Sequence, residues 1–160
     1  MAKKVKNFTS WDLPPDMQEN WKWVCALDAY DFDDPEPLSE LITVSEQIPK
    51  MLRQAVADVI QGKRKPNKKA AAKLKLPASE RMKFAGTVSC LLSIVDAFKY
   101  GDLDGVADRL SIEPIDALRG LEDDAREIIK QASDDFGISI ETTENLLRDF
   151  RRKIEYWPNV

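Results

Sequence analysis

The sequence contains no histidine among its 160 residues. Histidine is the usual general base near neutral pH, the partner of nucleophilic serine or cysteine, and the commonest transition-metal ligand. Its absence excludes those catalytic pairs and leaves carboxylates, lysine or a bare metal ion for any enzyme. We therefore expect a protein that catalyses no reaction and uses no cofactor.

Cysteine is almost as scarce. Cys25 and Cys90 lie far apart and do not form a C-x-x-C pair, which argues against a zinc site and against a disulfide framework. We expect both thiols to be reduced and buried.

Long apolar runs are also missing. The most apolar stretch, Phe84 to Val95, is interrupted by Gly, Thr and Ser and is shorter than the ~20 residues of a membrane span. The basic start, Met1 to Lys6, is not followed by the apolar stretch of a secretory signal. These features predict a cytoplasmic protein with no membrane partner, and the length predicts a single domain over residues 1–160.

Acidic residues are absent from one segment of an otherwise acidic chain. The net charge is −4, but no Asp or Glu occurs between Gly62 and Lys75. The same stretch contains seven cations: Lys63, Arg64, Lys65, Lys68, Lys69, Lys73 and Lys75. Residues 59–101 carry ten basic and two acidic groups, whereas the segments on either side are both acidic. We call residues 63–75 the basic block.

The basic block has two interpretations. Exposed to solvent, it would attract phosphate groups, and folded back, it would neutralise the acidic thirds of the chain. The sequence leaves both open. A lysine-rich cluster without aromatic residues lacks a surface on which bases stack, so it would contact the backbone of a nucleic acid.

Apolar residues recur at helical spacing through most of the chain, and strand signals are scarce. The predicted fold class is all-α, a single compact bundle of six to eight helices with a helix-turn-helix-like C-terminal part. We expect an irregular tail over 1–13, N-terminal and central helices over 14–101, and a repeat region over 102–160. The expected helices are 16–29, 37 onward, 49–61, 77–101, 102–110, 114–132 and 140–156. Within the first, Trp21, Trp23 and Cys25 also alternate as in a strand.

The helix over 77–101 is expected at the centre of the core. Its apolar stripe is predicted to comprise Phe84, Val88, Leu91, Val95 and Phe98, at steps of four and three residues. Gly101 is a natural end for this helix.

An internal repeat relates Leu110–Leu121 to Phe136–Leu147 at an offset of 26 residues. Its second copy has Ser133 as a small residue of the first helix, Gly137 as the turn residue, Ile138 as an apolar plug and Thr143 packing the second helix back. This pattern resembles the helix-turn-helix of small DNA-binding regulators. Two amphipathic hairpins of similar period would also produce the repeat.

The resemblance implies which residues would face DNA. Positions toward the bases would be Ser139, Ile140, Glu141, Thr142, Asn145 and Arg148, and positions near phosphates would be Arg151, Arg152 and Lys153. Of these, the candidate readout residues are Ser139, Thr142, Asn145, Arg148 and Arg152. Glu141 and Glu144 place negative charge where phosphates approach, so this unit alone would bind weakly. More broadly, Asp34–Leu38, Ile48-Pro49 and Ala57–Arg64 followed by this unit are similar to small proteins of bacterial mobile elements.

The leading functional hypothesis is a nucleic-acid-binding or regulatory protein, with the basic block on phosphates and the hairpin at Gly137 supplying any sequence preference. The competing hypothesis is a protein-interaction module, an inhibitor or adaptor that uses acidic helical faces. A third, a carboxylate-bound metal at Asp31, Asp33, Asp34 and Glu36, ranks lower because Pro35 and the missing glycine break the EF-hand pattern.

Overall fold

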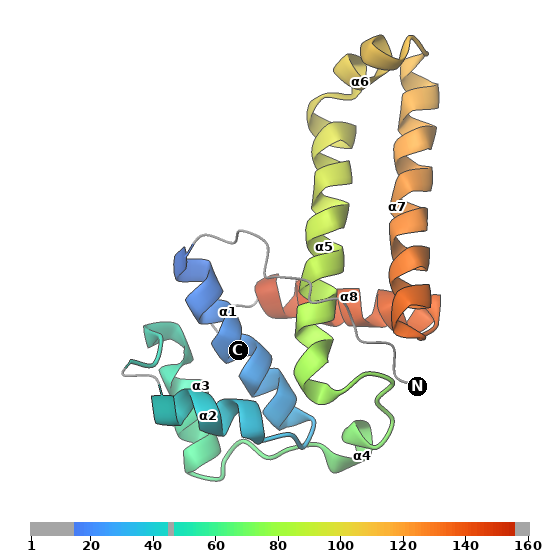
Figure 1. Ribbon diagram of the computed structural model, residues 1–160. Helices are drawn as coiled ribbons and strands as arrows, with labels where there is room; N and C mark the ends of the chain where they lie inside the picture. The colour runs from blue at the N-terminus through green and yellow to red at the C-terminus, as the bar shows by residue number, and fades with distance from the viewer. Residues whose placement is uncertain (1–14, 45–46, 156–160) are drawn as a thin grey trace.

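The computed structural model describes residues 15–44 and 47–155, and the side chains of residues 20–44 and 47–153. In these residues the chain forms eight α-helices and no strand (Figure 1), so the all-α prediction is confirmed. The predicted tail over 1–13 lies outside them. The helices are α1 (Pro15–Asp31), α2 (Glu36–Val44), α3 (Arg53–Ile60) after a 3-10 turn (Lys50–Leu52), α4 (Lys68–Ala71), α5 (Ala78–Gly101), α6 (Leu103–Leu110), α7 (Pro114–Phe136) and α8 (Ile140–Glu155).

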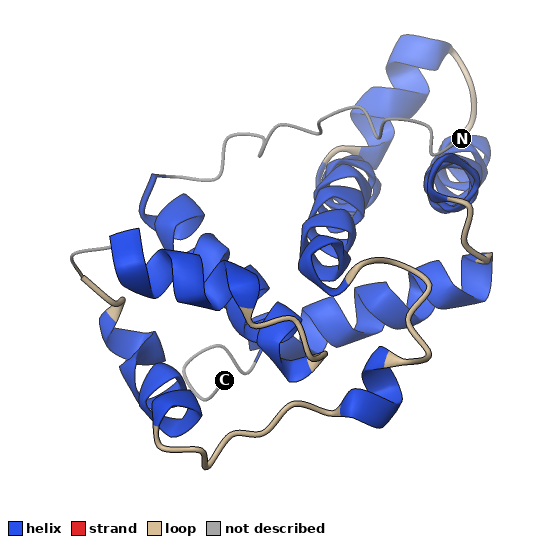
Figure 2. Ribbon diagram, turned by 60° about the horizontal axis from the view of Figure 1, so that its bottom comes forward, coloured by secondary structure: helices blue, strands red, loops and turns tan. Residues whose placement is uncertain are grey.

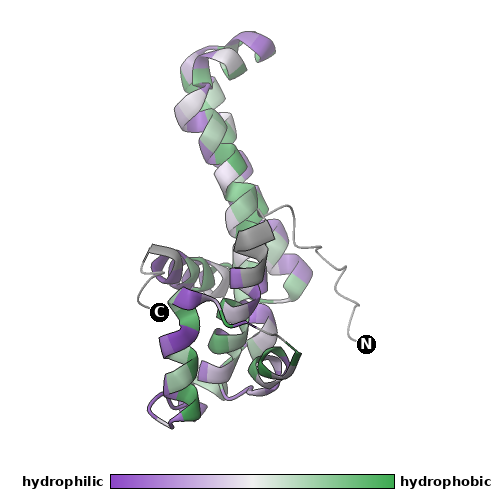
Figure 3. Cartoon of the chain, turned by 90° about the vertical axis from the view of Figure 1, so that its left-hand side faces the viewer, coloured by the Kyte–Doolittle hydropathy of each residue, from purple (hydrophilic) through white to green (hydrophobic). Residues whose placement is uncertain are grey.

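The molecule has a body and an arm. Helices α1 and α8 pack against the first half of α5, with α2 and α3 beyond α1 and α4 near the start of α5, whereas the second half of α5, α6 and the first half of α7 extend away from them (Figures 1 and 3). We call residues 93–128 the arm. Apolar and polar residues alternate along it in Figure 3, as expected for helices with little protein around them. Within the described residues no helix is long and apolar enough to cross a membrane.

Two apolar clusters form the core of the body. The first lies between α1, α2 and α3 and contains Trp23, Leu27, Leu38, Leu52 and Val56, all almost fully buried. It confirms that the first segment is a helix and not a strand.

The second cluster joins α5 to α8 through Phe84, Val88, Leu92, Leu146 and Phe150, among others. The Trp21 ring lies edge-on to Phe150, with centroids 5.1 Å apart. A Cβ at Gly86 would come within 2.9 Å of the Trp21 ring. The glycine therefore lets α1 approach α5 closely.

The predicted stripe on α5 is partly wrong. Phe84, Val88 and Val95 are buried as expected, but Leu91 and Phe98 are each 41% exposed, and Leu92 is buried instead. The stripe was placed about 50° off because α5 is apolar on two adjacent faces, and only one of them meets α7 and α8.

A buried ionic network connects α1, α5 and α8. The Asp28 side chain is fully buried and accepts hydrogen bonds from Arg81 Nε at 3.3 Å and from Lys153 Nζ. Arg81 Nη2 also donates to Asp149, and its guanidinium lies 3.8 Å from the centre of the Phe32 ring. The network fixes the C-terminal end of α8 against the end of α1.

The repeat at an offset of 26 is visible in the backbone. Ser111 and Gly137 both adopt left-handed conformations, with φ of 55° and 64°. In both turns the next N–H, that of Ile112 or Ile138, donates to the carbonyl five residues earlier. This is the Schellman arrangement that ends helices. The preceding helices differ in length, eight residues for α6 and 23 for α7. The two copies of the repeat therefore share the conformation of the turn but not the length of the helix before it.

The two cysteines differ in their surroundings, because Cys25 is buried and Cys90 is exposed. The expectation that both are buried is therefore wrong for Cys90. Burial raises the pKa of the Cys25 thiol from 9.0 to about 12, which favours the protonated form over the reactive thiolate.

We expect an aromatic disulfide reagent at pH 8 to modify one thiol per chain rapidly and the second only after unfolding. The raised pKa of the Cys25 thiol lowers the amount of reactive thiolate, and burial blocks access of the reagent to it. A Cys90→Ser variant should lose the rapid phase, and a rapid phase that persists in this variant would contradict the assignment.

Candidate nucleic-acid interface

The basic block begins with an anchored stretch. Arg64 donates to both carboxylate oxygens of Asp31 at the end of α1, at 2.7 and 2.5 Å. This hydrogen-bonded carboxylate raises the pKa of the Arg64 guanidinium above its ordinary value. The Tyr30 hydroxyl donates to the Arg64 carbonyl, and the Asn67 N–H donates to the Asp31 carbonyl. The half-buried Arg64 therefore attaches the start of the basic block to α1, and its guanidinium is already paired with Asp31.

The six lysines of the basic block are different. Each is exposed, and none forms an ion pair with a residue that the structure describes; they are Lys63, Lys65, Lys68, Lys69, Lys73 and Lys75. Lys68 and Lys69 lie on α4, whose first turn is capped by the Asn67 side chain, which accepts from the Ala70 N–H at 3.0 Å. Of the two interpretations of the basic block, the one in which it faces solvent is the one observed.

The start of α8 uses two of the predicted readout residues for its own structure. Ser139 Oγ accepts from the Thr142 N–H at 3.1 Å and lies 2.9 Å from the Thr142 hydroxyl. Both residues therefore contribute to the helix cap. Thr143 is buried, with its hydroxyl 2.7 Å from that of Ser133 on α7. The side chains at this end hold the corner between α7 and α8.

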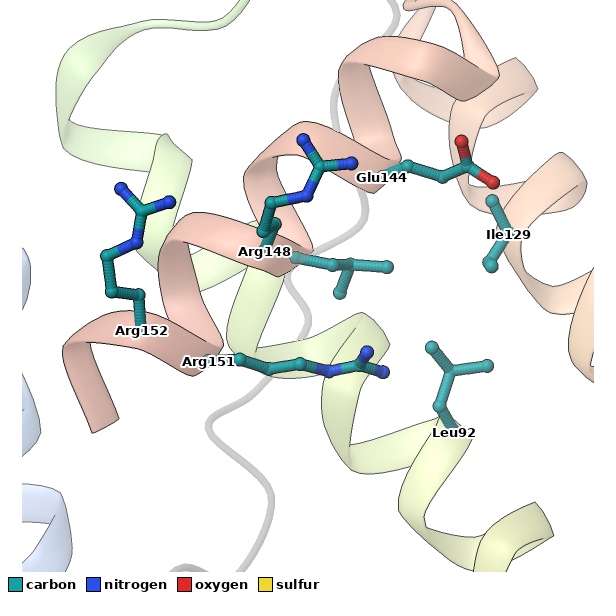
Figure 4. Close-up of a pocket in the computed structure, with 7 residues that line it drawn as sticks. Leu92, Ile129, Glu144, Arg148, Arg151 and Arg152 are labelled. Atoms are coloured by element: carbon teal, nitrogen blue, oxygen red, sulfur yellow. The ribbon is translucent and has the colours of Figure 1, made fainter. Parts of the chain in front are cut away.

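The middle and end of α8 expose the remaining predicted residues. Asn145, Arg148 and Arg152 are all exposed, and Arg148 Nη1 donates to Asn145 Oδ1 at 3.0 Å. An open depression of about 590 Å³ lies between α8, Leu92 and Ile129, lined by Arg148, Arg151, Arg152, Leu147 and Glu144 (Figure 4). Its cations lie toward the C-terminal end of α8 and its one acid, Glu144, toward the other end.

The tertiary structure brings the basic block and α8 together. A second depression, of about 260 Å³, is lined by Asn67 and Ala70 from the segment around α4 and by Arg152 and Lys153 from α8. Figure 2 shows α4 beneath α8, joined to α5 by the loop that contains Lys73 and Lys75. The segment that contains the basic block and the C-terminal end of α8 thus line one depression, together with Asp31, Asp149 and Arg81.

Two residues that hold this arrangement were missed by the sequence analysis. Arg81 lines the second depression and pairs with the buried Asp28. The signal was present, because Asp28 follows Leu27 on the apolar side of α1 and an unpaired acid is not stable there. Its partners, which are distant in the chain, could not be identified from the sequence.

Comparison of the chain with protein-family models, with curated proteins and with solved structures gives no match. The function of this surface is therefore inferred from the chemistry of its own residues.

Proposed function

We propose that the protein binds nucleic acid through a cationic surface composed of the six exposed lysines of the basic block and the arginines of α8. The observation that carries this proposal is that the segment around α4 and the C-terminal half of α8 line the same depression. Cations that are exposed and unpaired can each neutralise a phosphate and release counterions. Arg64 is excluded from the proposed contacts because Asp31 occupies it.

Within this proposal the lysines grip the phosphate backbone, and the exposed side chains of α8, Asn145, Arg148 and Arg152, face the bases. Amide and guanidinium groups match the donor and acceptor pattern of base edges. Ser139 and Thr142 contribute less, because their hydroxyls bond to each other and to the helix start. The membership of a family of small mobile-element regulators stays a prediction.

Changing Lys65, Lys68 and Lys69 together to Glu tests the proposal. We expect the wild type to bind a short mixed-sequence DNA duplex with an affinity that falls steeply with salt. If each lysine neutralises one phosphate, the triple variant should show a slope of log Kobs against log salt that is shallower by about 2.7, and it should bind at least about tenfold more weakly at low salt. Fluorescence anisotropy measures both quantities.

The matched control changes Arg119, Arg126 and Lys130 of α7 to Glu. These cations are also exposed, their pairs with neighbouring acids are surface pairs of little energetic weight, and the change in net charge is the same. The control should bind almost like the wild type. Equal losses in both variants would show that only the total charge matters, and no binding by the wild type at low salt would refute the proposal.

A second candidate function is a protein-interaction module, an inhibitor or adaptor. The observation that favours it is the outer surface of α7, where seven acids and three bases are all exposed. Such a face would hold a basic partner. It predicts a stoichiometric protein complex that persists at salt concentrations at which DNA dissociates.

A further inference from the structure

A second apolar stripe runs along α5, beside the stripe that forms the core. Leu91, Ile94 and Phe98 are 41%, 53% and 41% exposed. With Thr87 before them and Gly101 after them, their spacing is four, three, four and three residues. This is the a/d spacing by which one helix packs against another in a coiled coil. We call Thr87, Leu91, Ile94, Phe98 and Gly101 the seam.

The seam differs from the other exposed apolar residues of the described chain. Val44, Ile60 and Tyr100 are more exposed but scattered, and isolated surface apolar residues need no explanation. Leu110, Ile112 and Ile115 are exposed together at the turn between α6 and α7, but they form no row along one helix. The seam is continuous over two heptads, about 21 Å at 1.5 Å per residue. Its spacing therefore fits a helix and not an extended or irregular segment.

The charge of the seam favours a second copy of the chain. In a two-fold interface each group near the axis meets its own kind, so charges there repel. No charged residue occurs between Phe84 and Val95. Beyond that stretch, Lys99 is already paired with Glu122 of α7 at 3.3 Å. The seam itself contains no charged residue, and Asp96, the charged residue nearest Ile94 in the sequence, lies about 200° around the helix from it and faces away from the seam.

We propose that the protein forms a two-fold dimer in which α5 packs antiparallel against α5 of a second copy, with the axis near Ile94. Leu91 then packs against Phe98 of the partner subunit, and Thr87 lies opposite Gly101 of the partner subunit. A parallel pair is disfavoured, because the two bodies, each packed on the first half of its own α5, would lie at the same level and crowd each other (Figures 1 and 3). The antiparallel pair places the two bodies at opposite ends.

The size of the seam sets the strength of the dimer. One helical face of about 21 Å buries less than the ~800 Å² per partner of a standard stable interface. The dimer is therefore concentration-dependent, with a dissociation constant on the order of 10–100 μM, typical of small interfaces. This inference is independent of nucleic-acid binding.

Sedimentation equilibrium without nucleic acid tests the dimer. The mass should rise from 18.2 kDa toward twice that value with concentration. Ile94→Glu places two unpaired carboxylates at the axis and should weaken the dimer at least about a hundredfold. The matched control Ile60→Glu changes an apolar residue of α3 that is 69% exposed and should leave association unchanged. Circular dichroism verifies that both variants fold.

Cysteine pairing tests the orientation in a Cys90→Ser background. A mixture of Leu91→Cys and Phe98→Cys chains should form a mixed disulfide dimer, and neither alone should do so. Efficient crosslinking of each variant alone would indicate a parallel pair and overturn the proposed geometry.

Three other results would overturn the dimer itself. These are a wild type that stays monomeric at several hundred micromolar, equal weakening by Ile60→Glu, and a dimer that appears only after deletion of residues 1–14. The last result would identify that N-terminal segment as the occupant of the seam.

Discussion

Replacing Asp28 with Ala is expected to lower the free energy of unfolding by about 3–5 kcal/mol, a large share of the ~5–15 kcal/mol of a typical domain. The carboxylate is fully buried and accepts from both Arg81 and Lys153. Its removal leaves Lys153 without its counter-charge and leaves Arg81 with only Asp149, whose side chain is 44% exposed. Chemical denaturation of the wild type and the variant gives the difference directly.

The matched control for Asp28 is Asp123→Ala. Asp123 is also paired with an arginine, Arg126, but both side chains are about 70% exposed, and exposed pairs contribute no more than about 1 kcal/mol. A result for Asp28→Ala no larger than that of the control would show that the buried network is not what joins α1, α5 and α8.

Leu92→Ala is expected to cost about 2–3 kcal/mol, whereas Leu91→Ala should cost less than about 1 kcal/mol. Leu92 packs into the cluster between α5 and α8, while Leu91 is 41% exposed. Large-to-small substitutions in a core cost about 2–5 kcal/mol, and the lower half applies because Leu92 also borders an open depression. For a chain of this size the thermal midpoint should fall by about 4–12 °C in the first variant.

Dilute protein is required for the Leu91 comparison, because Leu91 also belongs to the seam. Thermal melts monitored by circular dichroism at low micromolar concentration therefore compare monomers. A larger loss for Leu91→Ala than for Leu92→Ala would show that α5 is rotated relative to the structure described here.

Local sequence determined the helices and their ends. Pro114 begins α7 as predicted, and Gly137 adopts the predicted left-handed turn conformation, although the helix continues to Phe136 and not only to residue 132. The offset of 26 residues aligned Ser111 with Gly137, and the structure shows the left-handed conformation at both, although it is more strained for serine than for glycine. These features follow from residues within one or two turns of each other, so one sequence suffices to predict them.

The sequence also determined the chemistry of the candidate surface, but not its geometry. Seven cations without an acid predicted a phosphate-attracting segment. Only the fold decided that Arg64 would be occupied by Asp31 and that the six lysines would stay exposed. Attachment depends on a carboxylate 33 residues away, and contacts of that range leave no periodic pattern in the sequence.

Tertiary structure alone decided which face of α5 is core. The helix is apolar on two adjacent faces, and periodicity cannot distinguish a face that meets α7 and α8 from one that meets solvent. Likewise, the local sequence does not predict that Asp28, Arg81 and Lys153 lie together, because packing brings these side chains together from separate helices. Short-range preferences thus determined the helices, and long-range packing decided which of their residues are buried, paired or exposed.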